Sequence, residues 1–170
     1  RGPASVTGVD AAWCYTVFDV KLTGVVLTSK FGIRGMFNDG GGSFVILSSI
    51  VGLRAGGGRP RHAYAASEGG TLGLSNSMAV HYGRDNIRVN CIAPGHGYSP
   101  MVARPSSVYL LDLLRRPGPL GFDGTPWDVA YGILFLSSDY TRWITRASLP
   151  RRAALLAAPP LARSPNLQEH

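Results

Sequence analysis

Two short segments that are expected to form buried strands constrain the fold more than any other feature of this sequence. Residues 44–47 form a continuous apolar run after three glycines and Ser43, and residues 88–93 are expected to form another buried strand, which ends at Pro94-Gly95. A short run of this kind is typical of a strand covered on both faces in a parallel sheet. A third strand is expected at residues 144–149.

Helical patterns separate these strands. Residues 10–37 and 64–82 predict two helices, the first of them stopped by the glycines that begin at Gly40. Thr125, Pro126 and Asp128 supply a cap, a proline at the first helical position and an acid three residues after the cap, which predicts a third helix to about residue 137. The alternation predicts an α/β protein with a parallel sheet, and a sheet of about three strands predicts half of a doubly wound fold.

The length and the net charge of the chain restrict the classes of function that need to be considered. A chain of 170 residues is expected to form one domain. Its first residue is Arg1 and its first methionine is Met36, so we expect a processed chain or a fragment. The net charge of +7 raises the possibility of nucleic-acid binding, but no aromatic-interleaved basic stripe occurs. The basic residues are scattered, apart from a C-terminal group of Arg142, Arg146, Arg151, Arg152 and Arg163. We therefore expect no nucleic-acid partner.

Other classes are also disfavoured. No stretch approaches the roughly 20 apolar residues that a membrane span needs, so no membrane association is expected. Cys14 and Cys91 lie in apolar segments without metal-ligand spacing, which favours reduced, buried thiols in a cytoplasmic protein. No metal site is expected, because the histidines lack both the mutual spacing and the set of acidic residues that a metal site needs; they are His62, His81, His96 and His170.

Several motifs, in order and with consistent spacing, resemble those of the short-chain dehydrogenase/reductase family. The motifs are Ser48-Ser49-Ile50-Val51-Gly52, Tyr64-Ala65-Ala66-Ser67, Ile87-Arg88-Val89-Asn90-Cys91-Ile92-Ala93-Pro94-Gly95 and Gly124-Thr125-Pro126-Trp127-Asp128. The resemblance covers most of the chain. It implies a partial Rossmann-like, NAD(P)-binding domain over residues 1–150, followed by an Ala/Pro/Arg-rich tail over residues 151–170.

The resemblance also implies a chemistry. Members transfer a hydride between NAD or NADP and an alcohol or ketone, and the matching positions make Tyr64 the general acid/base and Ser49 the donor to the substrate oxygen. Tyr64, Pro94, Gly95 and Ser99 fall where the family contacts the nicotinamide end of the cofactor. Free tyrosine has a pKa near 10, and the family supplies a lysine four residues later, one helical turn on, to favour the phenolate.

Two positions depart from the family pattern. Glu68 occupies the lysine position, and Lys21 occupies the position of an asparagine that supports proton relay. Repulsion then replaces attraction at the phenolate, at roughly 3 kcal/mol for a unit charge about 5 Å away at an effective dielectric near 20. If the two changes compensate, Lys21 and Glu68 are expected within ion-pair range, about 4 Å. The other explanation, which we favour, is damage or truncation of an ordinary reductase.

Two functions therefore stay open. The first is an oxidoreductase acting on a small alcohol or ketone, inactive as this 170-residue chain. The second is a non-catalytic module that acts through oligomerisation or binding, because the helices over residues 10–37 and 64–82 resemble those with which the family forms dimers or tetramers. Residues 101–119 fall at the family's substrate loop, where leucines suggest an apolar substrate face or simply core packing.

Overall fold

The computed structural model describes residues 5–54, 60–95, 97 and 124–151, and the statements below concern these residues. A three-stranded parallel sheet has the order β1-β2-β3, with β1 at Gly42–Leu47, β2 at Ile87–Pro94 and β3 at Ser148–Arg151. Gly42 pairs with Ile87 at one end of the sheet and Pro94 pairs with Arg151 at the other. The predicted parallel α/β fold is confirmed.

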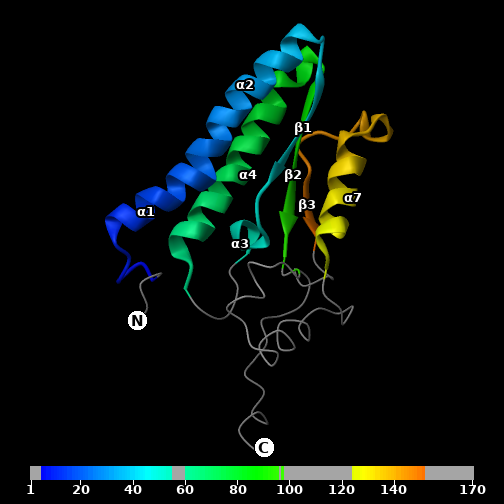
Figure 1. Ribbon diagram of the computed structural model, residues 1–170. Helices are drawn as coiled ribbons and strands as arrows, with labels where there is room; N and C mark the ends of the chain where they lie inside the picture. Colours follow the sequence, from blue (N-terminus) through cyan, green and yellow to red (C-terminus); the bar gives the residue numbers. More distant parts are fainter. Residues whose placement is uncertain (1–4, 55–59, 96, 98–123, 152–170) are drawn as a thin grey trace, which may run out of the picture.

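Helices cover both faces of the sheet (Figure 1). On one face lie α4, at His62–Tyr82, and the long N-terminal helical segment; α7, at Pro126–Ser137, covers the other face. The N-terminal segment runs through α1 at Ala11–Phe18, the π-helical turn η1 at Asp19–Thr23 and α2 at Gly24–Asn38. The single helix expected over residues 10–37 is therefore present, with a π turn near its middle.

The core lies between the sheet and the helices α2 and α4. Its fully buried members on β2 include Ile87 and Val89, and Ile33 and Leu72 meet them from the two helices. Residues 89–93 of β2 are all buried, since both faces of this strand are covered. Asn90 is buried too, and its side-chain amide donates to Ile144 O at 2.9 Å and accepts from Ala147 N at 3.0 Å.

The predicted start of the third strand is wrong. Pairing with β2 begins at Ser148 rather than at residue 144. Arg146 has a left-handed backbone conformation, with φ at 61°. Main-chain hydrogen bonds to β2 still occur around it, from Arg146 N to Val89 O and from Cys91 N to Ala147 O, both at 2.8 Å, and the Asn90 side chain adds bonds to Ile144 O and from Ala147 N. The segment before Ser148 therefore follows β2 without forming a regular strand.

Local signals at the helix ends are confirmed. Thr125 and Asp128 form the predicted capping box at the start of α7, with Thr125 N donating to Asp128 Oδ2 at 2.6 Å. A short helix, α3, at Ile50–Leu53, follows β1. Residues 152–170, which include most of the predicted tail, lie outside the described residues, as does the predicted substrate loop at 101–119.

Candidate active site

Ser49 and Tyr64 lie at the carboxyl end of the sheet. Ser49 lies two residues after the end of β1 and caps α3, where its hydroxyl accepts a long hydrogen bond of 3.4 Å from Val51 N. Tyr64 lies in the first turn of α4, and its side chain is half-buried. Ligands of open parallel sheets bind outside the carboxyl ends of the strands, so both hydroxyl groups occur where such a site is expected.

Close packing of α3 against α4 holds this end of the sheet together. Ser48, which is buried, donates its hydroxyl hydrogen to Glu68 O at 3.0 Å, and its main-chain N–H donates to Ile92 O at 2.8 Å. A Cβ at Gly52 would lie 2.7 Å from the carbonyl carbon of Glu68. Glycine at this position is therefore what allows the main chains of the two helices to approach.

The π-helical turn η1 carries Lys21 to the same region. Such a turn inserts one extra residue into a helix and re-aims the side chains around it, and π turns occur frequently at functional sites. Thr71 of α4, fully buried, fixes the turn: its hydroxyl lies 3.2 Å from Lys21 O and 3.0 Å from Ser67 O. This contact joins the N-terminal helical segment to α4 one turn beyond Glu68.

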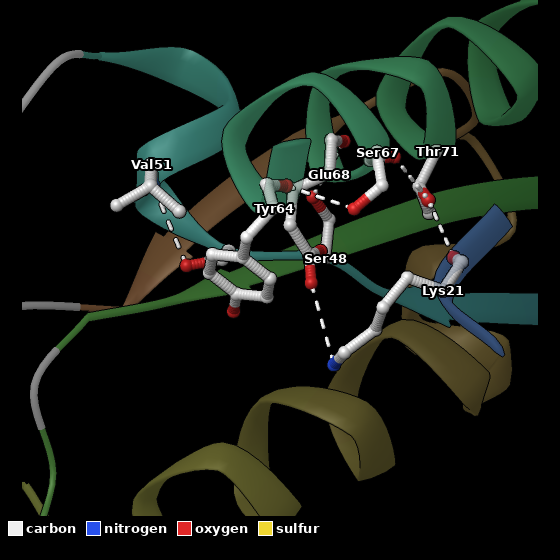
Figure 2. A network of polar contacts seen from close by, with 8 residues as sticks. Lys21, Ser48, Val51, Tyr64, Ser67, Glu68 and Thr71 are labelled. Carbon is white, nitrogen blue, oxygen red and sulfur yellow. Dashed lines mark hydrogen bonds and ion pairs between the residues drawn. The ribbon is translucent and has the colours of Figure 1, made fainter. Parts of the chain in front are cut away.

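Lys21 and Glu68 form an ion pair, as predicted from the paired departures. Lys21 Nζ lies 3.4 Å from Glu68 Oε1, and the two side chains are 47% and 3% exposed. The ammonium group also lies over the ring of Tyr64, 5.3 Å from its centroid. Figure 2 shows the Lys21 side chain reaching from its helix toward α4, where Tyr64 and Glu68 stand one turn apart.

The thiol of Cys91 lies in the core next to this region. Burial raises the pKa of Cys91 from 9.0 to about 11; a hydrogen bond with the Ser48 main chain opposes the rise, and the negative charge of Glu68 adds a smaller increase. The thiol is therefore protonated and inert at neutral pH. Cys91 is a packing residue beneath the site, whereas Cys14, expected to be buried, is only half-buried.

The residues predicted at the nicotinamide end of the cofactor are partly described. Pro94 is the last residue of β2 and Gly95 follows it, both half-buried at the carboxyl end of the sheet. Ser99 lies outside the described residues. Of the site residues predicted from the sequence, four lie beside β1 and α4, namely Lys21, Ser49, Tyr64 and Glu68. Pro94 and Gly95 lie at the end of β2, and Ser99 has no described position.

Sequence reasoning missed three residues that build the site: Ser48, Thr71 and Cys91. Ser48 could have been found, because neighbours in a strand point to opposite faces, so of Ser48 and Ser49 one had to face the core. Thr71 also carried a signal, since it follows Glu68 by three residues on the same face of the helix. Cys91 carried none, because its effect depends on the position of a carboxylate from another element.

Two classes of site find no support in the described ranges. Within residues 5–54, 60–95, 97 and 124–151, no group of three or more histidine, cysteine or acidic residues could hold a metal ion. Across the same part of the chain, no helix has the length and apolar character required to cross a membrane.

The chain is similar to a known protein family and to several curated proteins. A family model described as enoyl-(acyl carrier protein) reductase matches residues 2–150. Among curated proteins, the chain is 39% identical over 140 residues to cis-4-hydroxycyclohexanecarboxylate dehydrogenase of Sinomonas cyclohexanicum, covering 82% of this chain and 54% of the relative. It is 38% identical over 130 residues to the 3-oxoacyl-[acyl-carrier-protein] reductase FabG of Chlamydia muridarum, covering 76% and 51%.

Comparison with solved structures also finds proteins of similar fold. An oxidoreductase of the short-chain dehydrogenase/reductase family from Burkholderia thailandensis superposes with a TM-score of 0.84 at 32% identity, over 91% of this chain and 61% of that one. Levodione reductase superposes with a TM-score of 0.82 at 30% identity, over 88% and 60%. The chain spans about half the length of the curated relatives it matches.

Fold and site together define a class, the Rossmann-like α/β proteins with polar groups gathered at the carboxyl ends of a parallel sheet. Within that class, the chain belongs to the short-chain dehydrogenase/reductase family.

Proposed function

We propose that the protein carrying this chain is an oxidoreductase that transfers a hydride between NAD or NADP and an alcohol or ketone. The observation that carries the proposal is the arrangement of Ser49 and Tyr64. Both hydroxyl groups stand at the carboxyl end of β1, one on the cap of α3 and the other in the first turn of α4. Relatives named as a hydroxycyclohexanecarboxylate dehydrogenase and as 3-oxoacyl reductases support this choice of reaction.

In this proposal the two hydroxyl groups act on one substrate oxygen. Ser49 donates a hydrogen bond to it, and Tyr64 gives it a proton when a ketone is reduced or takes the proton when an alcohol is oxidised. When bound, the nicotinamide cofactor supplies or accepts the hydride. The proton therefore moves at the Tyr64 hydroxyl, and no other described side chain has to change its protonation state.

The residues at the carboxyl ends of the strands fit the nicotinamide end of such a cofactor. Gly95 carries no side chain at the end of β2, so a flat ring can approach the main chain there. The Lys21 ammonium is half-exposed and has three N–H donors, of which the ion pair with Glu68 engages one. Ribose hydroxyls are acceptors for such donors. Pro94, Gly95 and Lys21, together with Tyr64, are thus the residues proposed to hold this end of the cofactor.

The test is the oxidation of NADH and NADPH, followed by absorbance, in the protein that carries this chain. The panel should include a 4-oxocyclohexanecarboxylate and a 3-oxoacyl thioester, the substrate types that the relatives' names suggest. Tyr64→Phe is expected to lower kcat by 10²-fold or more, a typical size for general acid–base catalysis of about 10² to 10⁴. Tyr140→Phe is the matched control, because Tyr140 is 95% exposed; an equal loss in both variants would refute the role of Tyr64.

The 170 residues alone are expected to show no turnover, and NAD(P)H oxidation by the purified chain with a ketone panel would contradict that. A second candidate function, a non-catalytic module that acts through oligomerisation, is favoured by apolar side chains exposed on two helices. Phe31 on α2 is 67% exposed and Trp127 on α7 is 71% exposed. Sedimentation of the protein that carries this chain separates the two functions, since an oligomer without turnover supports the second.

A further inference from the structure

The feature that carries a further inference is the position of the Lys21 ammonium. It lies between two groups of α4 that stand one turn apart, at 3.4 Å from Glu68 Oε1 and 5.3 Å from the ring centroid of Tyr64. One face of the ammonium thus meets a buried carboxylate, and another meets the phenol that the proposed function uses. Figure 2 shows this bridging position.

The buried charge of Glu68 makes the contact between Lys21 and the Tyr64 ring important for the proton transfer proposed at Tyr64. Its side chain is 3% exposed, so water screens its charge poorly. A buried carboxylate one helical turn from Tyr64 opposes the formation of a negative phenolate, which the proposed proton transfer requires. A positive charge at the same place favours the phenolate. The two charges therefore act on Tyr64 in opposite directions, and the ammonium is the one that contacts its ring.

The structure fixes this position by more than the ion pair. The π turn at Asp19–Thr23 directs Lys21 toward α4, and the Thr71 hydroxyl holds the Lys21 carbonyl oxygen at 3.2 Å. The closeness of α3 at Gly52 and the hydrogen bond from Ser48 fix the main chain of α4 at Glu68 from the other side. Backbone contacts on both elements thus set where the two charges meet.

We propose that Lys21 is a positioning residue for Tyr64, supplying from the neighbouring helix the positive charge that Tyr64 needs beside it to act as an acid/base. Glu68, in this proposal, anchors the ammonium and is not itself a proton donor or acceptor in the reaction. The proposal rests on the proposed function, because it assigns Lys21 to the same proton transfer at Tyr64.

The test measures how readily Tyr64 forms a phenolate, without any cofactor. Tetranitromethane nitrates phenolate rings, and peptide mass spectrometry reads the rate at Tyr64 in the 170-residue chain at pH 8. Tyr140, 95% exposed, serves as the internal reference. Lys21→Met is expected to lower the Tyr64 rate relative to Tyr140 about fivefold, the factor that corresponds to about 1 kcal/mol. Glu68→Gln is expected to raise it.

Opposite changes of the Tyr64 nitration rate in Lys21→Met and Glu68→Gln distinguish a positioning role of Lys21 from a purely structural role of the ion pair. If the ion pair only held the helices together, both variants would loosen the same contact, and nitration of the half-buried Tyr64 ring would rise in both. The charge exchange K21E/E68K returns an ammonium to the same place from the other helix, and its Tyr64 rate is expected within about twofold of the parent. Lys21→Arg, which keeps the charge, is expected to behave in the same way.

Two controls complete the design. Lys30 is the other lysine of the chain, and its Nζ lies 5.8 Å from the ring of Phe31, so Lys30→Met removes a matched charge away from Tyr64. It is expected to leave the Tyr64 rate unchanged. If Lys21→Met does not fold, E68Q is compared with K21M/E68Q, in which no unpaired carboxylate is buried; the same fivefold fall is expected.

An unchanged or faster Tyr64 rate in Lys21→Met, or an equal fall in Lys30→Met, overturns the proposal. So does failure of the charge exchange to restore the rate in a folded chain. None of these results depends on NAD(P)H. Absence of turnover in the protein that carries this chain therefore counts against the proposed function alone, whereas an unaltered nitration rate counts against the role of Lys21 alone.

Discussion

Lys21→Met is expected to destabilise the fold more than Glu68→Gln, although both remove the same ion pair. The reason is unequal burial, since the Glu68 side chain is 3% exposed and that of Lys21 is 47% exposed. Without the lysine, a buried carboxylate loses its cation. Without the negative charge on Glu68, the remaining ammonium is solvated by water.

The magnitude follows from this asymmetry. Breaking a fully buried pair by removing one partner costs about 3–5 kcal/mol, because an uncompensated charge is left in the interior. Water reaches this pair on the side of Lys21, which reduces that figure to about 2 kcal/mol for Lys21→Met. For Glu68→Gln the loss resembles that of an exposed pair, about 0.2–1 kcal/mol.

The assay is urea unfolding of the 170-residue chain at pH 7, followed by circular dichroism. The series contains Lys21→Met, Glu68→Gln, the double variant and Lys30→Met, which removes a lysine without touching the ion pair. The double variant is expected to be more stable than Lys21→Met alone, because it buries no unpaired charge. A free energy of unfolding that falls equally in the two single variants, or a more stable Lys21→Met, would refute the reasoning.

Three further outcomes are expected. Gly52→Ala should lower the free energy of unfolding by about 1–3 kcal/mol, because its Cβ meets the main chain of α4, whereas Gly73→Ala, with open space around its Cβ, should not. A thiol reagent at pH 8 should label Cys14 and spare Cys91, whose pKa is raised to about 11 by burial; labelling of folded Cys91 should begin only as the pH approaches that value. Asp128→Ala should cost about 1 kcal/mol by removing the capping box of α7, and an unchanged urea midpoint would contradict this.

The main elements of the fold could be predicted because their signals are local. Residues 44–47 form an unbroken apolar run, residues 91–93 are all buried, and the Thr125 cap fixes the start of α7. The start of β3 could not be predicted, since it depends on Arg146 adopting a left-handed conformation beside β2. No local pattern of side chains marks that conformation. It is accompanied by hydrogen bonds of the Asn90 side-chain amide with Ile144 O and Ala147 N.

Part of the candidate site could likewise be predicted from the sequence, and part could not. The proximity of Lys21 and Glu68 could be predicted, because two departures of opposite charge at neighbouring positions favour an ion pair. The contact of Lys21 with the Tyr64 ring could not, since it depends on the π turn, which changes the direction of the side chain without a sequence signature. The resemblance to the family thus located the charged positions, and the helix geometry decided what each charge faces.

A carboxylate buried beneath a neighbouring helix also restricts which residues are tolerated at both positions of the ion pair. An ammonium at position 68 would face the ammonium of Lys21 and place two like charges in contact. A carboxylate at position 21 would meet the buried carboxylate of Glu68 in the same way. Neither charge can therefore be reversed alone, whereas reversing both keeps the pair.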